Sequence, residues 1–193
     1  MFAIAAAAAY ERTRMDDPHL VRVIADLDRL EPRLRDVTMG LDDAALHLQP
    51  PAGGWTIAQI FEHMRIADSS YVDGCLPKAI AKAQGKAKKP WKPSLFGGWL
   101  RRALANFQKP LPAPKIYRVA GVPRGDVVEA WLAGVRKLRA LIESADRLDL
   151  NTRLSSPVSK LIRISLGDAL AIPVVHSHRH LGQVERTRKA LGR

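Results

Sequence analysis

Apolar residues recur every three or four positions in four long stretches of the chain, which is the pattern of amphipathic helices. The stretches cover residues 18–39, residues 56–76, a segment that begins near residue 126, and residues 166–191. Four such helices with one long connection predict an all-α protein built as a four-helix bundle. The sequence shows no strand pattern and no internal repeat, so no sheet is expected.

Polar residues at the predicted helix ends support these boundaries. Asp17 followed by Pro18 is a favourable N-cap and first-turn pair for the first helix. Thr56 and Gln59 have the spacing of a capping box, which predicts that the second helix begins there. Pro173 lies inside the fourth stretch and is expected to kink that helix or to delay its start.

Length and composition predict one globular domain. The chain has 193 residues, of which 47% are hydrophobic, and this fits a single domain at residues 16–193. Residues 1–15, which include five consecutive alanines, are expected to form a disordered extension. The single cysteine, Cys75, excludes an intramolecular disulfide and favours a reducing compartment, so a cytoplasmic location is expected. No apolar run approaches the roughly 20 residues that span a bilayer.

Charge is distributed unevenly along the chain. Residues 74–125 hold twelve Lys or Arg and no acidic residue, whereas the rest carries 19 basic and 19 acidic residues. The same residues hold seven of the thirteen prolines, which predicts a basic, proline-rich insertion between helices two and three. Within it, residues 110–114 are expected to be extended, and Ser94–Phe107 to form a short amphipathic helix. The insertion is either a solvated surface segment with no partner or a segment whose positive electrostatic field attracts anions.

Three of the six histidines lie close together as His176, His178 and His180. The i, i+4 spacing places His176 and His180 above one another on one helix face, where two neutral imidazoles can bind one divalent metal ion. Both lie at the border of the apolar stripe, whereas His178 points about 160° away from His176. His63 has a matching border position on the second helix and is the candidate third ligand. The alternative is that each histidine is an ordinary hydrogen-bonded residue at the core boundary.

Other polar residues offer weaker candidates. Gln183 is either a partner of the histidines or a residue of the polar face. Glu62 points about 100° away from His63. Cys75 is expected to be a buried structural thiol. His19 and His47 have no spaced partners and are expected at the surface or the core boundary.

Two motifs resemble those of the DinB/YfiT-like superfamily. One is Gly53-Gly54-Trp55-Thr56-Ile57, which leads into His63, with the Trp55 ring expected to be buried beside the helix start. The other runs from Ser165-Leu166-Gly167-Asp168 into His176-x-x-x-His180-x-x-Gln183. The resemblance extends from about residue 18 to the end of the chain. It implies an up-down-down-up four-helix bundle and a metal held by His63, His176 and His180. The basic insertion and Pro173 depart from the family pattern.

The resemblance also implies a range of activities. Its relatives include thiol-dependent S-transferases and a mycothiol-dependent isomerase that use nickel or zinc. We therefore expect a divalent metal ion (Zn, Ni or Fe) and a metal-dependent enzyme, either a thiol S-transferase or a hydrolase. A small-molecule substrate such as an anionic thiol is the expected partner, and a homodimer is a candidate assembly. No general base is identified.

Two alternatives remain. The first is a non-catalytic metal-binding or stress-associated bundle, in which the metal only joins helices two and four. The second is a nucleic-acid or anionic-surface binder, which rests on the basic insertion and its aromatic residues Trp91, Phe96, Trp99 and Phe107. Deletion of residues 86–92 is expected to leave the bundle folded, because the four apolar stripes lie outside them.

Overall fold

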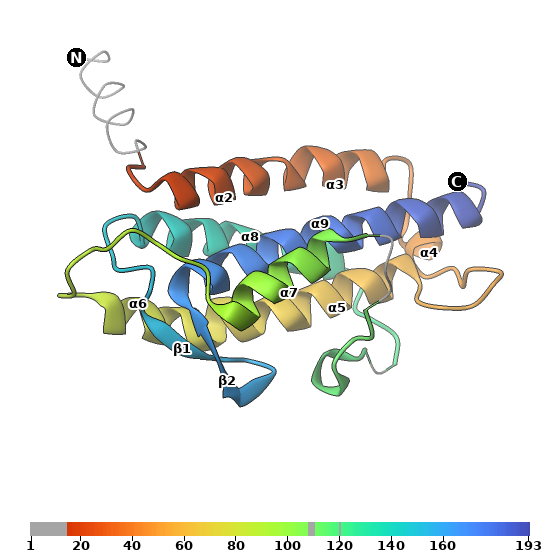
Figure 1. The fold of residues 1–193 in the computed structure, drawn as a ribbon. Coiled ribbons are helices and arrows are strands. Elements are labelled where there is room, and N and C mark those ends of the chain that lie inside the picture. Colours follow the sequence, from red (N-terminus) through yellow and green to blue (C-terminus); the bar gives the residue numbers. More distant parts are fainter. Residues whose placement is uncertain (1–14, 108–110, 120) are drawn as a thin grey trace, which may run out of the picture.

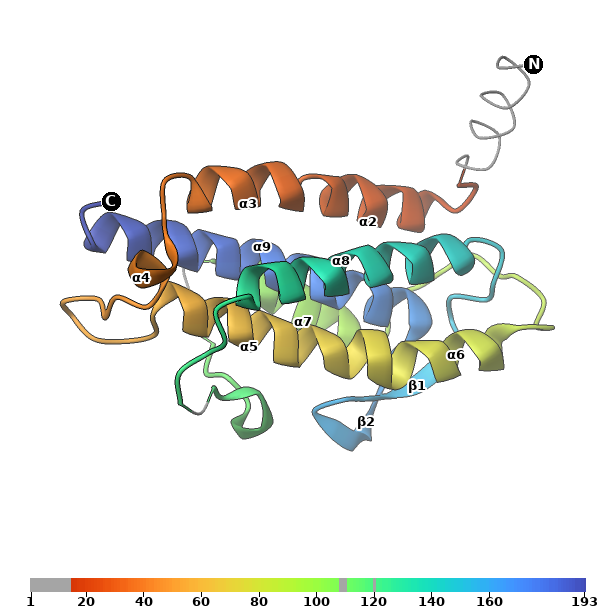
Figure 2. The ribbon, with the colours of Figure 1, turned by 180° about the vertical axis from the view of Figure 1, so that it is seen from behind.

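The computed structural model describes residues 15–107, 111–119 and 121–193. This part of the chain is mostly helical, with one small two-stranded sheet. The helices are α2 (Pro18–Asp28), α3 (Leu30–Thr38), α4 (Asp43–Leu46), α5 (Ile57–Ser69), α6 (Leu76–Ala83), α7 (Leu95–Ala105), α8 (Val127–Ser144) and α9 (Leu166–Ala190). Long helical rods lie side by side, and the C-terminal helix α9 contacts α2, α3, α5, α6, α7 and α8 (Figures 1 and 2).

The apolar stripes of the rods meet in one core. The Phe61 ring of α5 lies against the Trp131 ring of α8, with 5.5 Å between their centroids. Removal of these side chains from water is the main force that holds the helices together. The largest fully buried side chains include Leu20, Leu30, Ile57, Ile60, Phe61, Met64, Trp131, Ile142 and Leu166.

Most predicted helix ends are confirmed. The Asp17 side chain accepts hydrogen bonds from the backbone at the start of α2. Thr56 and Gln59 form both bonds of the capping box at the start of α5. The first predicted helix, however, is divided at Arg29 into α2 and α3. Pro32 explains the break, because it has no N–H for the carbonyl of residue 28 and its ring crowds that carbonyl.

Helix α9 begins at Leu166, with the Ser165 side chain as its N-cap, and continues through Pro173 to Ala190. Of the two alternatives for Pro173, a kink or a delayed start, the delayed start is therefore excluded. Pro173 is buried inside the helix, where the surrounding helices pack against it. Packing of this kind offsets the backbone hydrogen bond that a proline removes.

A π-helical turn at Ser70–Cys75 joins α5 to α6, so the second predicted helix extends to Ala83 as one rod. A π-turn hydrogen-bonds from residue i to i+5 and holds one residue more than an α-turn, and such turns are frequent at functional sites. This one follows directly on the helix that carries His63.

The expectation that the chain has no strands is wrong. Strands β1 (Arg153–Ser156) and β2 (Ser159–Ser165) form an antiparallel hairpin with a tight turn between them. Leu154 and Ile164 pair across the hairpin and are buried, whereas Arg163 on the opposite face is exposed. Only a few residues of each strand alternate in this way, and serines weaken the apolar pattern of β1. Such short strands give little signal in a sequence.

The basic insertion is packed onto the rods. Its predicted short helix is present as α7, which lies against α9 and begins at the N-cap Ser94. A buried cluster, here called the Asp168 clamp, joins the two helices. The carboxylate of Asp168 accepts hydrogen bonds from the backbone N–H and hydroxyl of Ser94, both 2.7 Å, from the Ser165 hydroxyl, 2.7 Å, and from Arg101, 3.0 Å. Gly97 permits this approach, since a Cβ there would lie 2.5 Å from the Asp168 carboxyl group.

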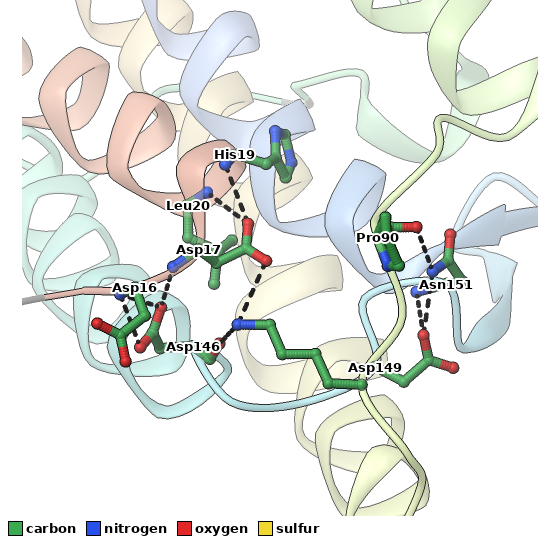
Figure 3. Close-up of polar contacts among 9 residues, drawn as sticks. Asp16, Asp17, His19, Leu20, Pro90, Asp146, Asp149 and Asn151 are labelled. Atoms are coloured by element: carbon green, nitrogen blue, oxygen red, sulfur yellow. Dashed lines mark hydrogen bonds and ion pairs between the residues drawn. The ribbon is translucent and has the colours of Figure 1, made fainter.

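The segment before α7 is fixed as well. The Trp91 ring stacks on His19 with 3.6 Å between centroids, and its N–H donates to the Ser165 hydroxyl. Lys88 pairs with Asp17 and donates to the carbonyl of Asp146. Figure 3 shows this region, where the start of α2 is bound to the turn after α8. The expectation that residues 86–92 can be deleted without effect on folding therefore has to be revised.

Two further expectations concern the ends of the described ranges. The predicted N-terminal extension, residues 1–15, lies outside the described residues apart from Met15, and so does Pro110. Residues 111–114 have no regular secondary structure, and a 3₁₀ turn at Lys115–Tyr117 follows. Within the described part of the chain, no helix is both long enough and apolar enough to cross a membrane.

Candidate metal centre

The three histidines singled out from the sequence meet between α5 and α9. His63 projects from the middle of α5, and His176 and His180 project from successive turns of α9. One ligand atom from each lies within 4.8 Å of those of the other two. The Nε2 atoms of His63 and His176 are 3.2 Å apart, and the ring centroids of His176 and His180 are 4.5 Å apart. The i, i+4 spacing on α9 and the matching position on α5 thus converge on one point.

Each imidazole is held by a different acceptor at its Nδ1 atom. His63 Nδ1 lies 2.8 Å from the backbone carbonyl of Tyr117. His176 Nδ1 lies 3.3 Å from the Asp68 carboxylate. His180 Nδ1 lies 2.8 Å from the side-chain oxygen of Gln183. A carbonyl oxygen only accepts, so His63 Nδ1 carries the proton and its Nε2 keeps a lone pair. With Asp68 ionised and the Gln183 amide oxygen facing the ring, His176 and His180 take the same tautomer.

The inward-facing nitrogens are therefore arranged as ligands. Lone pairs on the Nε2 atoms of His63 and His176 face one another at 3.2 Å, which is unfavourable unless a cation or a proton lies between them. Metal-binding histidines characteristically donate their second N–H to a carboxylate or a carbonyl. Three imidazole nitrogens suit Zn, Ni or Fe, so this donor set fits a divalent transition-metal ion.

Burial keeps the three rings neutral. His63 is 2% exposed, and desolvation lowers its pKa. Burial, together with the neighbouring His63, lowers the pKa of His176 to about 3. Burial and the two neighbouring histidines lower the pKa of His180 to about 2. Neutral imidazoles are the form that binds a metal, so no proton has to be removed at neutral pH.

Asp68 supports the centre and was missed in the sequence. Its second carboxylate oxygen accepts hydrogen bonds from the Trp131 ring N–H, 3.1 Å, and the Ser177 hydroxyl, 3.2 Å. Burial raises the pKa of Asp68 to about 7. A signal was present: on a helical wheel Asp68 falls between Phe61 and Met64, in the middle of the apolar face. An acidic residue at such a position is buried and needs polar partners.

The acceptor for His63 comes from the end of the basic insertion. The 3₁₀ turn that contains Tyr117 lies against α5. The Tyr117 hydroxyl lies 2.9 Å from the Ser70 hydroxyl in the π-turn, which fixes the turn over the histidine. Every residue has a backbone carbonyl, so no pattern of residue types could have predicted this acceptor.

The remaining candidates have other environments. His178 lies 2.8 Å from the carbonyl of Asp26 and is not part of the centre, in agreement with its predicted direction. His19 is buried against Trp91, and its Nε2 lies 2.9 Å from the carbonyl of Gly167. Glu62 pairs with Arg65. Burial raises the pKa of the Cys75 thiol to about 11, so the thiol is a poor nucleophile at neutral pH.

Trp55, by contrast, belongs to the surroundings of the centre. Its half-buried ring lies 4.8 Å from the ring of His63. The predicted burial beside the start of α5 is thus partial, and the ring borders the histidine cluster.

Comparison with protein families agrees with this arrangement. The family model of the DinB superfamily matches residues 26–184, which is most of the chain. The chain belongs to the DinB superfamily. The match includes all three converging histidines and the whole basic insertion. No curated protein and no solved structure matches the chain.

Proposed function

We propose that this DinB-superfamily protein is a metal-dependent enzyme whose divalent metal ion is held by His63, His176 and His180. The observation that carries the proposal is the set of three Nδ1 acceptors. Asp68, Gln183 and the Tyr117 carbonyl each fix one ring. Three independent partners of this kind orient three Nε2 lone pairs toward one point. Ordinary histidines at a core boundary have no need of such a shared orientation.

Three protein ligands leave a further coordination position open to water or substrate, as in catalytic rather than structural zinc sites. A divalent ion in such a position supplies a lowered pKa for a bound water or thiol at neutral pH. This chemistry supports a thiol S-transferase or a hydrolase. The chain's own residues hold the three imidazoles neutral and oriented, and the half-buried Trp55 ring shields His63 from water.

A small anionic thiol is the substrate class that we favour. The basic insertion surrounds part of the centre through Tyr117, and its excess of Lys and Arg attracts anions. We further propose that the long helices form a single four-helix bundle with up-down-down-up topology in a cytoplasmic protein. The side-by-side rods of Figures 1 and 2 support this arrangement.

Metal analysis of protein purified without an affinity tag tests the ligand set. We expect about one divalent ion per chain, loss of that ion in His176→Ala, and its retention in the matched variant His178→Ala. Retention of the ion in His176→Ala would refute the assignment.

A second measurement separates an enzyme from a protein in which the metal only joins two helices. A spectroscopic probe of exchangeable water on a cobalt-substituted protein, with and without a small anionic thiol, distinguishes the two. A spectral change on thiol addition supports the enzyme. A coordinatively closed site with no response favours the non-catalytic alternative.

A further inference from the structure

Two leucines project into solvent from neighbouring elements. Leu95 at the start of α7 is 95% exposed, and Leu161 in β2 is 92% exposed. Trp99, one turn after Leu95, is 51% exposed. Residues four apart lie on one face of a helix, so Leu95 and Trp99 form an apolar strip. The strip lies opposite Gly97 and Leu104, which are buried.

The elements that carry these side chains are neighbours in the fold. Helix α7 packs against β2, and in Figure 1 both are drawn below α2 and α3, with α7 in front of α9 and α5. The Ser165 hydroxyl at the end of β2 accepts a hydrogen bond from Trp91, just before α7. The hairpin register shifts between Ser155, which pairs with Arg163, and Ser156, which pairs with Ser159. Leu161 therefore lies in an irregular part of β2, four residues before the point at which the strand is bound to the segment that leads into α7.

Positive charge surrounds the three apolar side chains, and acidic residues are absent from the elements that carry them. Residues 74–125 and the hairpin, residues 153–165, contain no Asp or Glu. We call the three apolar side chains, together with the exposed basic residues of α7, the hairpin and the segment before α7, the α7–hairpin surface. Its exposed basic residues are Lys92, Arg102, Arg153, Lys160 and Arg163.

We propose that the α7–hairpin surface binds the surface of an anionic lipid bilayer. Projecting leucines can enter the boundary between headgroups and acyl chains, and tryptophan is favoured at that depth. Lys and Arg beside them are attracted by anionic headgroups. A nucleic acid is less well matched, because single-stranded sites stack bases on aromatic rings, whereas the most exposed residues here are aliphatic.

This binding is peripheral and does not depend on the proposed metal chemistry. Transfer of one exposed leucine out of water strengthens binding by about tenfold or more. Each basic residue near an anionic surface adds about fivefold at moderate salt. The combination predicts reversible association with anionic vesicles that weakens as salt is added.

Co-sedimentation of the full-length protein with vesicles tests the proposal. The vesicles contain equal parts phosphatidylcholine and phosphatidylglycerol, and vesicles of phosphatidylcholine alone serve as the comparison. We expect binding to the anionic vesicles and a drop of at least about tenfold in Leu95→Ser with Leu161→Ser. Replacement of basic residues by glutamine should weaken binding at low salt and have little further effect at high salt. The replaced residues are Lys92, Arg102 and Lys160.

Matched variants distinguish binding through this surface from nonspecific hydrophobic binding to vesicles. Val21→Ser with Met39→Ser removes two exposed apolar side chains, 45% and 64% exposed, from α2 and the end of α3, and should leave binding unchanged. Lipids with brominated acyl chains should quench part of the tryptophan fluorescence, and Trp99→Phe should abolish that part. Unchanged melting temperature and metal content identify the variants that are folded.

Three results would overturn the proposal. The first is wild-type protein that does not distinguish anionic from neutral vesicles. The second is a leucine variant that binds vesicles as tightly as the Val21/Met39 control. The third is tighter binding to a short DNA duplex than to vesicles, sensitive to the glutamine replacements but not to the leucine replacements, which would assign the surface to nucleic acid.

Discussion

Helix α9 carries two buried polar clusters, the Asp168 clamp in its first turn and the histidine centre farther along. In the clamp, Asp168 receives donors from Ser94, Ser165 and Arg101, so that its charge is neutralised within the chain. In the centre, outer partners hold three rings, and the inner lone pairs converge without a donor between them. Buried polar atoms whose hydrogen bonds are all made within the chain have a structural role. Lone pairs that converge on one point instead indicate a binding site for a ligand.

A buried histidine outside the centre allows a second comparison. His19 and His63 are both buried, and each lies close to a backbone carbonyl. The other face of His19 is covered by Trp91, which leaves the ring as part of a stack. His63 instead lies against two more histidines. Burial alone therefore does not separate a structural histidine from a ligand, but the chemistry of its neighbours does.

The largest expected effect comes from the clamp. Asp168→Ala removes the partner of Arg101 and leaves the buried hydroxyls of Ser94 and Ser165 without an acceptor. We expect a loss of about 3 kcal/mol in the free energy of unfolding, measured with urea. Asp168→Asn keeps the shape and should cost less. Metal affinity of the folded fraction should stay as in the wild type, and a parallel loss of metal would show that the clusters are coupled.

The next effect concerns the centre. Asp68→Asn keeps the size of the side chain but removes the charge that holds His176. Metal affinity, measured by competition with a chelator, should fall by about tenfold or more. Asp168→Asn is the matched control, because it removes another buried carboxylate that lies outside the centre. Equal losses of affinity in both variants would contradict the division between the clusters.

The smallest expected effect is on the free energy of unfolding and comes from the two N-cap residues Thr56 and Ser94. Thr56→Ala should lower the free energy of unfolding by about 1 kcal/mol through loss of the cap on the helix that carries His63. Ser94→Ala should cost more, since Ser94 caps α7 and also donates to Asp168. Thermal or urea unfolding measures both. The opposite order would mean that the Ser94 hydroxyl contributes little to the clamp.

Features that repeat along the sequence were predictable. The helices that carry His63 and His176 follow from regular apolar spacing, and the cap at Thr56 marks the start of the first of them. The i, i+4 pair follows from helix geometry. The break at Arg29 could have been predicted from Pro32, which lies three residues after it. The hairpin was missed because its strands are short. The helix over residues 166–190 is predictable from its apolar spacing, but the packing that accommodates Pro173 inside it is tertiary and is not contained in a local pattern.

Contacts between distant segments were not predictable. The charge count marks residues 74–125 as a basic stretch. No local pattern, however, indicates that Trp91 stacks on His19 or that Asp168 accepts hydrogen bonds from Ser94 and Arg101. The three converging histidines were foreseeable as a set. Their outer partners were foreseeable only in part: Gln183 from its spacing to His180, and Asp68 from its place in an apolar face.

The acceptor for His63 is a main-chain oxygen, and this affects how the site can change in evolution. No substitution at Tyr117 removes that oxygen directly, so residues of the surrounding segment are free to vary as long as the chain keeps its path. An inserted or deleted residue between α7 and α8 would move the carbonyl even if every histidine stayed in place. Loss of the centre in related chains should therefore follow changes in the length of this segment as well as changes in the ligands themselves.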